Sequence, residues 1–173
     1  LSHFEIRKGA TWETATEVYT GKNTAYLLPM LKGGSYTYLI KAIDTDKKPS
    51  ITAASISFTV LKPSAPVVTT RIVGANIEIS WTQPTSTFPI VEYELKQNGV
   101  SLGRIKSTFF VLKAPVAGNY TFSVTAINAV NESGYEGSAG VTITAPGEVT
   151  LSPQVIDNNV LLRWTPPIVG SLP

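Results

Sequence analysis

The sequence contains one segment twice. Residues 34–44 (GSYTYLIKAID) recur 84 residues later as residues 118–128 (GNYTFSVTAIN). In both copies a tyrosine, a second aromatic residue, an aliphatic residue and an alanine occupy every second position, which is the spacing of a β-strand with one buried face. A repeat of this length indicates small modules in series. The feature therefore predicts an array of β-domains and argues against one large enzyme core.

A second repeat lies outside the first. Residues 76–84 (NIEISWTQP) recur 83 residues later as residues 159–167 (NVLLRWTPP). On the expected strands, each tryptophan shares one face with aliphatic residues two and four positions earlier. Trp81 and Trp164 are therefore both predicted to be structural core residues.

A third repeat orders the strands within a module. Residues 4–7 (FEIR) correspond to residues 93–96 (YELK), so the tryptophan strand precedes this strand, which precedes the tyrosine strand. The first copy lacks its tryptophan strand, and the third copy contains little else. We therefore expect residues 1–62 to form the C-terminal part of one domain, 63–146 a complete domain, and 147–173 the N-terminal strands of a third. On this interpretation the chain is a fragment of a longer protein.

Within residues 63–146 the alternation of apolar and polar residues predicts seven short strands. Asn98-Gly99 lies between the third and fourth of them and is a strong signal for a hairpin with a type I′ turn, which requires positive φ at both central positions. Seven short strands at this spacing indicate an antiparallel sandwich of two sheets. The predicted strands cover residues 67–73, 76–81, 91–97, 100–105, 108–112, 119–128 and 139–144.

The composition excludes several classes of protein. Charged residues make up 15% of the chain, and 14 basic against 12 acidic side chains leave a net charge of +2. Because the basic residues are not clustered, we expect no nucleic-acid partner. No apolar run approaches the roughly 18 residues of a membrane helix, so no membrane span is expected. The chain has no cysteine, which excludes the disulfide-bonded core of immunoglobulin domains.

The pattern L-x-x-P-x-x-G-x-Y-x-x-x-V-x-A-x-N over residues 112–128, which follows an I-x-I-x-W strand, resembles the fibronectin type III module. Residues 28–44 match the same pattern at the leucine, glycine, tyrosine, aliphatic and alanine positions. The resemblance implies tandem all-β, immunoglobulin-like sandwiches of seven strands each. It also places Tyr36 and Tyr120 in tyrosine corners, in which the phenol bonds back to the preceding loop.

A more local resemblance covers residues 4–21 (FEIRKGATWETATEVYTG) and the strand that ends with residues 41–44 (KAID). This stretch is similar to the fibronectin III repeats of tail-tip or central-fibre host-specificity proteins of tailed phages, the protein J family. The resemblance implies noncatalytic modules in the virion, with other tail proteins, further copies of the chain in a homotrimer, and a host-surface receptor as partners. Similar modules also act as spacers in secreted bacterial polysaccharide-degrading enzymes and in adhesins of the bacterial cell surface, and this alternative stays open.

Two residues of the first copy are candidates for contacts with other molecules. Trp12 lies in a loop that is five residues longer than its counterpart in the second copy. It either presents an exposed aromatic ring to a receptor, glycan or subunit, or folds back to cap the end of the sandwich. Leu39 occupies an outward strand position where the second copy carries Ser123, and it is predicted to mark a contact surface between chains or domains.

Two loop residues of the complete domain are candidates for packing between domains. Phe88 belongs to the loop at residues 85–88, and Tyr135 belongs to the loop at residues 129–135. By analogy with related sandwiches, we expect these loops at opposite ends of the domain, where neighbouring modules touch.

No residue pattern indicates catalysis, a cofactor or a metal site. His3 is the only histidine, and no Gly-x-Ser-x-Gly motif accompanies it. The acidic turns at residues 44–46 and 157–159 offer oxygen atoms but lack the glycine and distal glutamate of a calcium loop. Aspartate and asparagine in such turns ordinarily bond to their own backbone. We therefore expect no catalytic residues, no cofactor and no bound metal.

Overall fold

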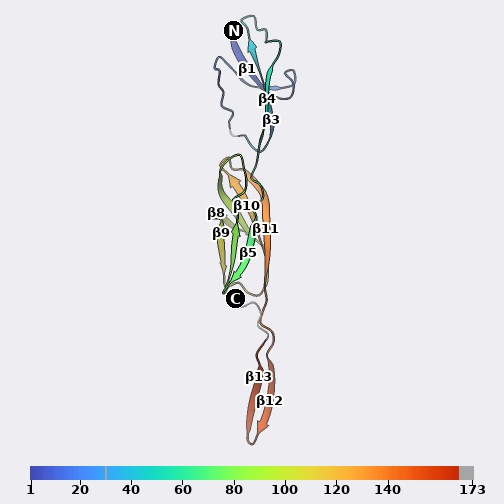
Figure 1. Cartoon of the computed structure of the whole chain (residues 1–173), viewed down its shortest axis with the longest axis vertical. Coiled ribbons are helices and arrows are strands. Elements are labelled where there is room, and N and C mark those ends of the chain that lie inside the picture. The colour runs from blue at the N-terminus through green and yellow to red at the C-terminus, as the bar shows by residue number, and fades with distance from the viewer. Residues whose placement is uncertain (30, 168–173) are drawn as a thin grey trace. The chain divides into compact units, whose positions relative to one another are not determined.

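The computed structural model describes residues 1–29 and 31–167. Every regular element in this part of the chain is a β-strand, and the strands form antiparallel sheets (Figure 1). The strands fall into two compact units. The first unit consists of Leu1–Pro63 with the short segments Thr85–Pro89 and Asn128–Ser133, and the second consists of residues 64–84, 90–127 and those from 134 onward.

The second unit contains a sandwich of two sheets with the strand order of a fibronectin III-like module. One sheet has the order β5-β6-β9 and the other has the order β11-β10-β7-β8. This arrangement confirms the predicted all-β, fibronectin III-like fold. The bounds are β5 (Val68–Val73), β6 (Asn76–Trp81), β7 (Ile90–Gln97), β8 (Val100–Ile105), β9 (Phe109–Lys113), β10 (Gly118–Asn128) and β11 (Ser133–Ile143).

The core of the sandwich lies where alternate side chains of the two sheets meet. Ile77 and Ile79 of β6 are completely buried, as are Phe122 and Val124 of β10. Burying an aliphatic or aromatic side chain of this size contributes about 1.5–3 kcal/mol, so this cluster is the main source of stability in the unit. Trp81 packs edge-on against the ring of Tyr93, with the ring centroids 5.7 Å apart, and is 5% exposed.

The predicted strand bounds agree closely with the structure, except for β11. This strand begins at Ser133, although the sequence predicts a start at residue 139. The early part of β11 (SGYEGS) is polar and rich in small residues, so it shows no apolar alternation and carries no strand signal. The turn at Asn98 and Gly99 has φ values of 49° and 81°, which are the positive angles that a type I′ turn requires.

The first unit contains one four-stranded sheet with the order β2-β1-β3-β4. In its register Phe4 pairs with Ala42 and Ile6 pairs with Ile40, so these apolar side chains share one face of the sheet. Among residues 1–29 and 31–63 no second sheet covers this face. The bounds are β1 (His3–Lys8), β2 (Thr16–Gly21), β3 (Gly34–Ile43) and β4 (Ala54–Val60).

Two loops that the sequence places at opposite ends of a domain lie together in the first unit. The amide N–H of Ala129 donates a hydrogen bond to the carbonyl of Pro89 at 2.9 Å. The expectation of opposite ends is therefore wrong. The physical reason is that β7 and β10 are adjacent in one sheet with opposite directions, so the start of β7 lies beside the end of β10.

Hydrogen bonds connect these loops to the rest of the first unit. The amide of Gly33 donates to both carboxylate oxygens of Glu132, at 2.9 and 3.0 Å. The amide of Leu61 donates to Thr87 Oγ1 at 2.7 Å, and the amide of Thr87 donates to the carbonyl of Leu61 at 3.0 Å. Bonds to a carboxylate are stronger than neutral ones, so Glu132 fixes the backbone at Gly33.

Tyr36 and Tyr120 make equivalent hydrogen bonds in the two repeats. The phenol of Tyr36 donates to the carbonyl of Lys32 at 2.7 Å, and that of Tyr120 donates to the carbonyl of Val116 at 2.8 Å. Each bond reaches back four residues into the loop before the strand. This is the geometry of the tyrosine corner that the sequence resemblance implies.

Replacing Tyr120 with phenylalanine is expected to lower the free energy of unfolding of the second unit by about 0.5–1.5 kcal/mol, the usual net value of one hydrogen bond. The ring stays in place beside Phe122, at a centroid distance of 6.3 Å, so the change removes the bond and little packing. Urea unfolding followed by fluorescence measures the shift. An unchanged midpoint would mean that water replaces the bond without loss.

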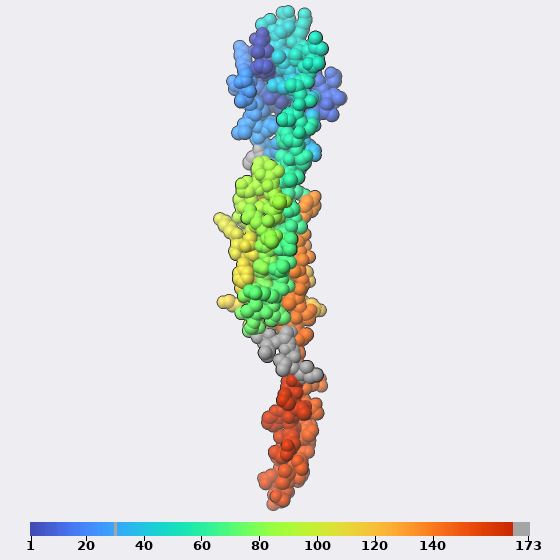
Figure 2. All heavy atoms as spheres, viewed as in Figure 1, coloured from blue at the N-terminus to red at the C-terminus, as the bar shows by residue number. Residues whose placement is uncertain are grey.

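The strands β12 (Thr150–Ile156) and β13 (Asn159–Thr165) form a two-stranded sheet. Every residue of this hairpin is exposed; its atoms are orange to red in Figure 2. Trp164, predicted to be a core residue, is 65% exposed. The structure differs from this prediction because no described strand lies opposite the hairpin to bury its apolar face. The division into three domains stays a prediction.

Candidate interaction surfaces

Trp12 folds back onto the outer face of the sheet in the first unit. Its ring centroid lies 4.4 Å from the guanidinium carbon of Arg7 and 5.2 Å from Nζ of Lys41. Arg7 Nη1 also donates to the carbonyl of Trp12 at 2.9 Å, and Arg7 forms an ion pair with Glu5. Trp12 is half-buried by these contacts. The ring therefore lies on the face of the sheet and not over an end of a sandwich. A contact of Trp12 with another molecule stays a prediction.

Leu39 shares this outer face with Lys41 by strand alternation, and it lies opposite Arg7 in the sheet register. The sequence predicts an outward contact at Leu39. In the structure Leu39 is only 6% exposed, so little of it can touch a partner, although it is among the residues that line the groove described below. A single strand pattern does not reveal this burial.

Replacing Trp12 with alanine is expected to lower the stability of the first unit by about 1 kcal/mol, because a cation–π contact at a partly exposed site contributes about 0.5–1 kcal/mol. Hydrogen exchange of the β1 and β3 amides measures the loss. The matched control is Glu13→Ala, a change of the exposed neighbour that should alter stability by less than about 0.5 kcal/mol. Equal effects of the two changes would contradict the role of the ring.

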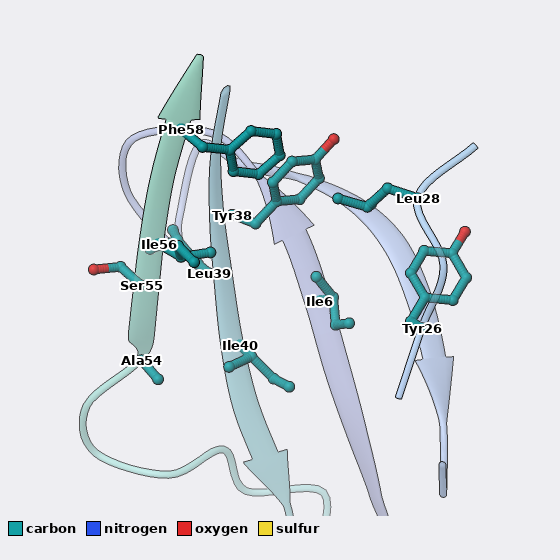
Figure 3. A pocket seen from close by; sticks show the side chains of 10 residues that line it. All are labelled: Ile6, Tyr26, Leu28, Tyr38, Leu39, Ile40, Ala54, Ser55, Ile56 and Phe58. Atoms are coloured by element: carbon teal, nitrogen blue, oxygen red, sulfur yellow. The ribbon is translucent and has the colours of Figure 1, made fainter. Parts of the chain in front are cut away.

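The opposite, inner face of the same sheet carries an apolar groove with a volume of about 260 Å³. Figure 3 shows Tyr38, Phe58 and Leu28 near one another, with Ile6 and Ile40 farther along the face. We call this surface the open face. It consists of Ile6, Tyr26, Leu28, Tyr38, Ile40, Ile56 and Phe58.

Aromatic rings line one end of the open face. The ring centroids of Tyr38 and Phe58 are 5.9 Å apart, and Tyr36 stacks against both. Burial raises the pKa of the Tyr38 phenol above its ordinary value, and the neighbouring phenols of Tyr36 and Tyr26 raise it further. The neutral phenol is therefore favoured. The surface is suited to apolar contact and not to acid–base chemistry.

Part of the open face was not predicted from the sequence. Ile56 is 63% exposed and Tyr26 is 40% exposed, and neither was identified as a contact residue. The alternation S-I-S-F-T-V over residues 55–60 is the signal that could have identified Ile56 and Phe58.

The two loop candidates occupy different units. Phe88 is half-buried and lies in the segment Thr85–Pro89 of the first unit. Tyr135 is 59% exposed and belongs to the second unit, near the start of β11. That both residues pack between domains stays a prediction.

Residues considered for metal binding or catalysis have ordinary structural partners. Asp44 accepts a hydrogen bond from the amide of Lys48 at 2.8 Å, as expected for an aspartate in a turn. His3 Nδ1 lies 3.1 Å from Ser2 Oγ. Within residues 1–29 and 31–167, no group of three or more acidic or histidine side chains could hold a metal ion. The same part of the chain contains no helix with the length and apolarity to cross a membrane.

Comparison with known proteins gives only distant similarity. No protein-family model matches the chain. The fibronectin(III)-like modules of CbhA from Clostridium thermocellum are 16% identical, with a TM-score of 0.39 over 83% of this chain and 78% of theirs. The chicken interferon gamma receptor alpha chain is 16% identical, with a TM-score of 0.39 over 83% of this chain and 85% of its own.

A third solved structure is the spore cortex lytic enzyme SleM of Clostridium perfringens. It is 17% identical, with a TM-score of 0.42 over 57% of this chain. The match covers 37% of SleM, so this chain corresponds to about a third of that enzyme's length.

Proposed function

We propose that the chain is a noncatalytic spacer and contact region, built from fibronectin III-like modules, in the tail tip or central tail fibre of a phage. The observation that carries the spacer role is the pair of tyrosine corners, Tyr36 to Lys32 and Tyr120 to Val116, which fix the same loop in both repeats. Prolines at residues 63 and 66 and at residue 146 stiffen the connections between repeats. Stiff modules in series would hold the host-contacting end of the protein at a fixed distance from the tail.

The assignment to a phage tail is supported by the sequence of residues 4–21, with its longer tryptophan-containing loop. Other tail proteins, further copies of the chain in a homotrimer, and a host-surface receptor are the partners that this assignment implies. The low net charge of +2 limits nonspecific adhesion to charged surfaces. A spacer in a secreted polysaccharide-degrading enzyme or a surface adhesin is the competing role.

Immunogold labelling tests the location. Antibodies raised against the purified chain should label the tails of phage particles from the source culture in electron micrographs. Label on bacterial cell surfaces, or on a secreted glycoside hydrolase in the medium, with none on tails would overturn the phage assignment and support the competing role.

A pull-down with host cells separates a spacer from a receptor-binding module. If the chain acts only as a spacer, the purified chain does not sediment with host cells at concentrations up to about 100 μM, where a contact of −5.5 kcal/mol would be half-saturated. If it binds, Trp12→Ala should weaken sedimentation while Glu13→Ala should leave it unchanged. Binding that neither change affects would assign recognition to another surface.

A further inference from the structure

Asn98 is the one asparagine of the sequence that glycine follows. It occupies the first central position of the turn between β7 and β8, with a φ of 49°, and Gly99 follows with a φ of 81°. Both residues are exposed. A Cβ atom at Gly99 would meet no atom within 4 Å beyond its chain neighbours. Solvent therefore reaches the turn, and nothing crowds the peptide bond between the two residues.

An asparagine side chain can react with the peptide nitrogen that follows it. The electron pair of the Gly99 nitrogen forms a bond to Cγ of Asn98, the bond from Cγ to Nδ2 breaks, and ammonia leaves with the proton of the peptide nitrogen. A five-membered succinimide ring remains. Water then adds to one of the two ring carbonyls and opens the ring to aspartate or to isoaspartate. Glycine in the second position favours the attack because it has no side chain to crowd the nitrogen.

Hydrogen bonds to β10 hold the Asn98 side chain against this reaction. Its Oδ1 accepts from the amide of Thr121 at 2.7 Å, and its Nδ2 donates to the carbonyl of Asn119 at 3.4 Å. Closing the ring brings Cγ nearly into line with the backbone carbonyl carbon about the Cα–Cβ bond, which is far from any staggered rotamer. The side chain must therefore release Thr121 and Asn119 before the ring can close.

Asn131 provides an internal comparison in the same chain. It also lies in an exposed turn with a positive φ, of 55°, but the residue that follows it is Glu132. The two asparagines thus share a backbone conformation and access to water. They differ in the residue whose nitrogen must attack, so the comparison isolates the contribution of Gly99.

We propose that Asn98 is a site of spontaneous covalent modification, at which the Gly99 nitrogen displaces ammonia and water opens the ring. The hydrogen bonds to Thr121 and Asn119 set the rate, because the reaction proceeds from molecules in which the turn is locally open. Local opening of this kind requires much less free energy than unfolding of the sandwich. The site is independent of the proposed spacer role.

Isoaspartate at position 98 changes the hairpin because it lengthens the backbone by one methylene group. A two-residue turn fixes the register of the strands that it joins, and here Gln97 pairs with Val100. β8 is the last strand of its sheet, beside β7. The longer turn should therefore loosen β8. Ordinary aspartate should not, since it tolerates positive φ and keeps a carboxylate oxygen for the Thr121 amide.

The first experiment incubates the purified full-length chain in water enriched in a heavy oxygen isotope and identifies modified peptides by mass spectrometry. In the folded chain we expect conversion at Asn98 before any other asparagine, Asn131 included, with heavy oxygen incorporated into the product. Conversion at Asn98 should be at least about tenfold faster in guanidinium chloride, because two hydrogen bonds no longer hold the side chain.

The second experiment measures hydrogen exchange of the β8 amides in the isoaspartate product after its separation by chromatography. The matched control is the Asn98→Asp variant, which carries the same added charge without the longer backbone. We expect β8 to lose protection in the isoaspartate product and to retain it in the control.

Three results would overturn parts of the proposal. No conversion at Asn98 in the folded chain, or earlier conversion of another asparagine, would contradict the site. Equal rates in the folded and the denatured chain would mean that the bonds to β10 do not control the reaction. Unchanged protection of β8 in the isoaspartate product would contradict the effect on the hairpin. None of these results bears on the location of the protein in a phage tail.

Discussion

Replacing Phe122 with alanine is expected to lower the free energy of unfolding of the second unit by about 3–5 kcal/mol, the range measured for deletion of a buried aromatic ring. Phe122 is completely buried in β10 and belongs to the cluster that contains Val124 and Ile79. A rigid sandwich cannot collapse fully into the space that the ring leaves, so lost contacts add to lost burial. A small β-domain has a total stability of about 5–15 kcal/mol, so this single change removes a large part of it.

The measurement is urea unfolding followed by the fluorescence of Trp81, in a chain whose Trp12 and Trp164 are replaced by phenylalanine. The matched control is Phe109→Ala, because Phe109 is 45% exposed on β9. We expect a loss of less than about half that of Phe122→Ala, since less area is buried. Similar losses for the two variants would contradict the position of the core.

Replacing Gly137 with alanine is expected to destabilise the second unit by about 1–3 kcal/mol, as overpacking of a close contact does. A Cβ atom at Gly137 would lie 1.9 Å from the carbonyl oxygen of Pro66 and 3.0 Å from its carbonyl carbon. Both are backbone atoms, so no side chain can rotate out of the way. The segment before β5 must move away from β11.

Gly140 on the same strand provides the control. A Cβ atom there would meet its nearest neighbour, the carbonyl oxygen of Tyr120, at 3.6 Å, which is ordinary contact. Gly140→Ala should therefore be neutral or slightly stabilising, because alanine restricts the unfolded chain. Thermal unfolding of both variants gives the comparison. If Gly137→Ala unfolds at the same temperature as Gly140→Ala, Pro66 does not pack against β11 in solution.

The sequence predicted the structure where a short local pattern determines the conformation or the burial of a residue. Trp81 and the Asn98-Gly99 turn follow from local spacing and from φ angles that few residues adopt. The tyrosine corner at Tyr120 followed from the resemblance to fibronectin III modules. The burial of Leu39 was not predictable in this way, because its strand alternation places it on the outward face although it is only 6% exposed. The exposure of Trp164 was also unpredictable, since a pattern identifies a side chain that can be buried but not the sheet that buries it.

The polar start of β11 shows another limit of sequence patterns. This segment is a strand because it pairs with β10, and its own residues do not alternate between apolar and polar. The close approach of Gly137 to Pro66 likewise depends on packing between segments that are far apart in the sequence.

The position of the loop at residues 9–15 determines which surface of the module can change in sequence. It connects β1 and β2, and its tryptophan lies against the outer side of the sheet through Arg7 and Lys41. The apolar side chains of Ile6 and Ile40 lie on the other side. Mutations in the loop at positions other than Trp12 can therefore change one surface of the module without touching the side chains of the other surface.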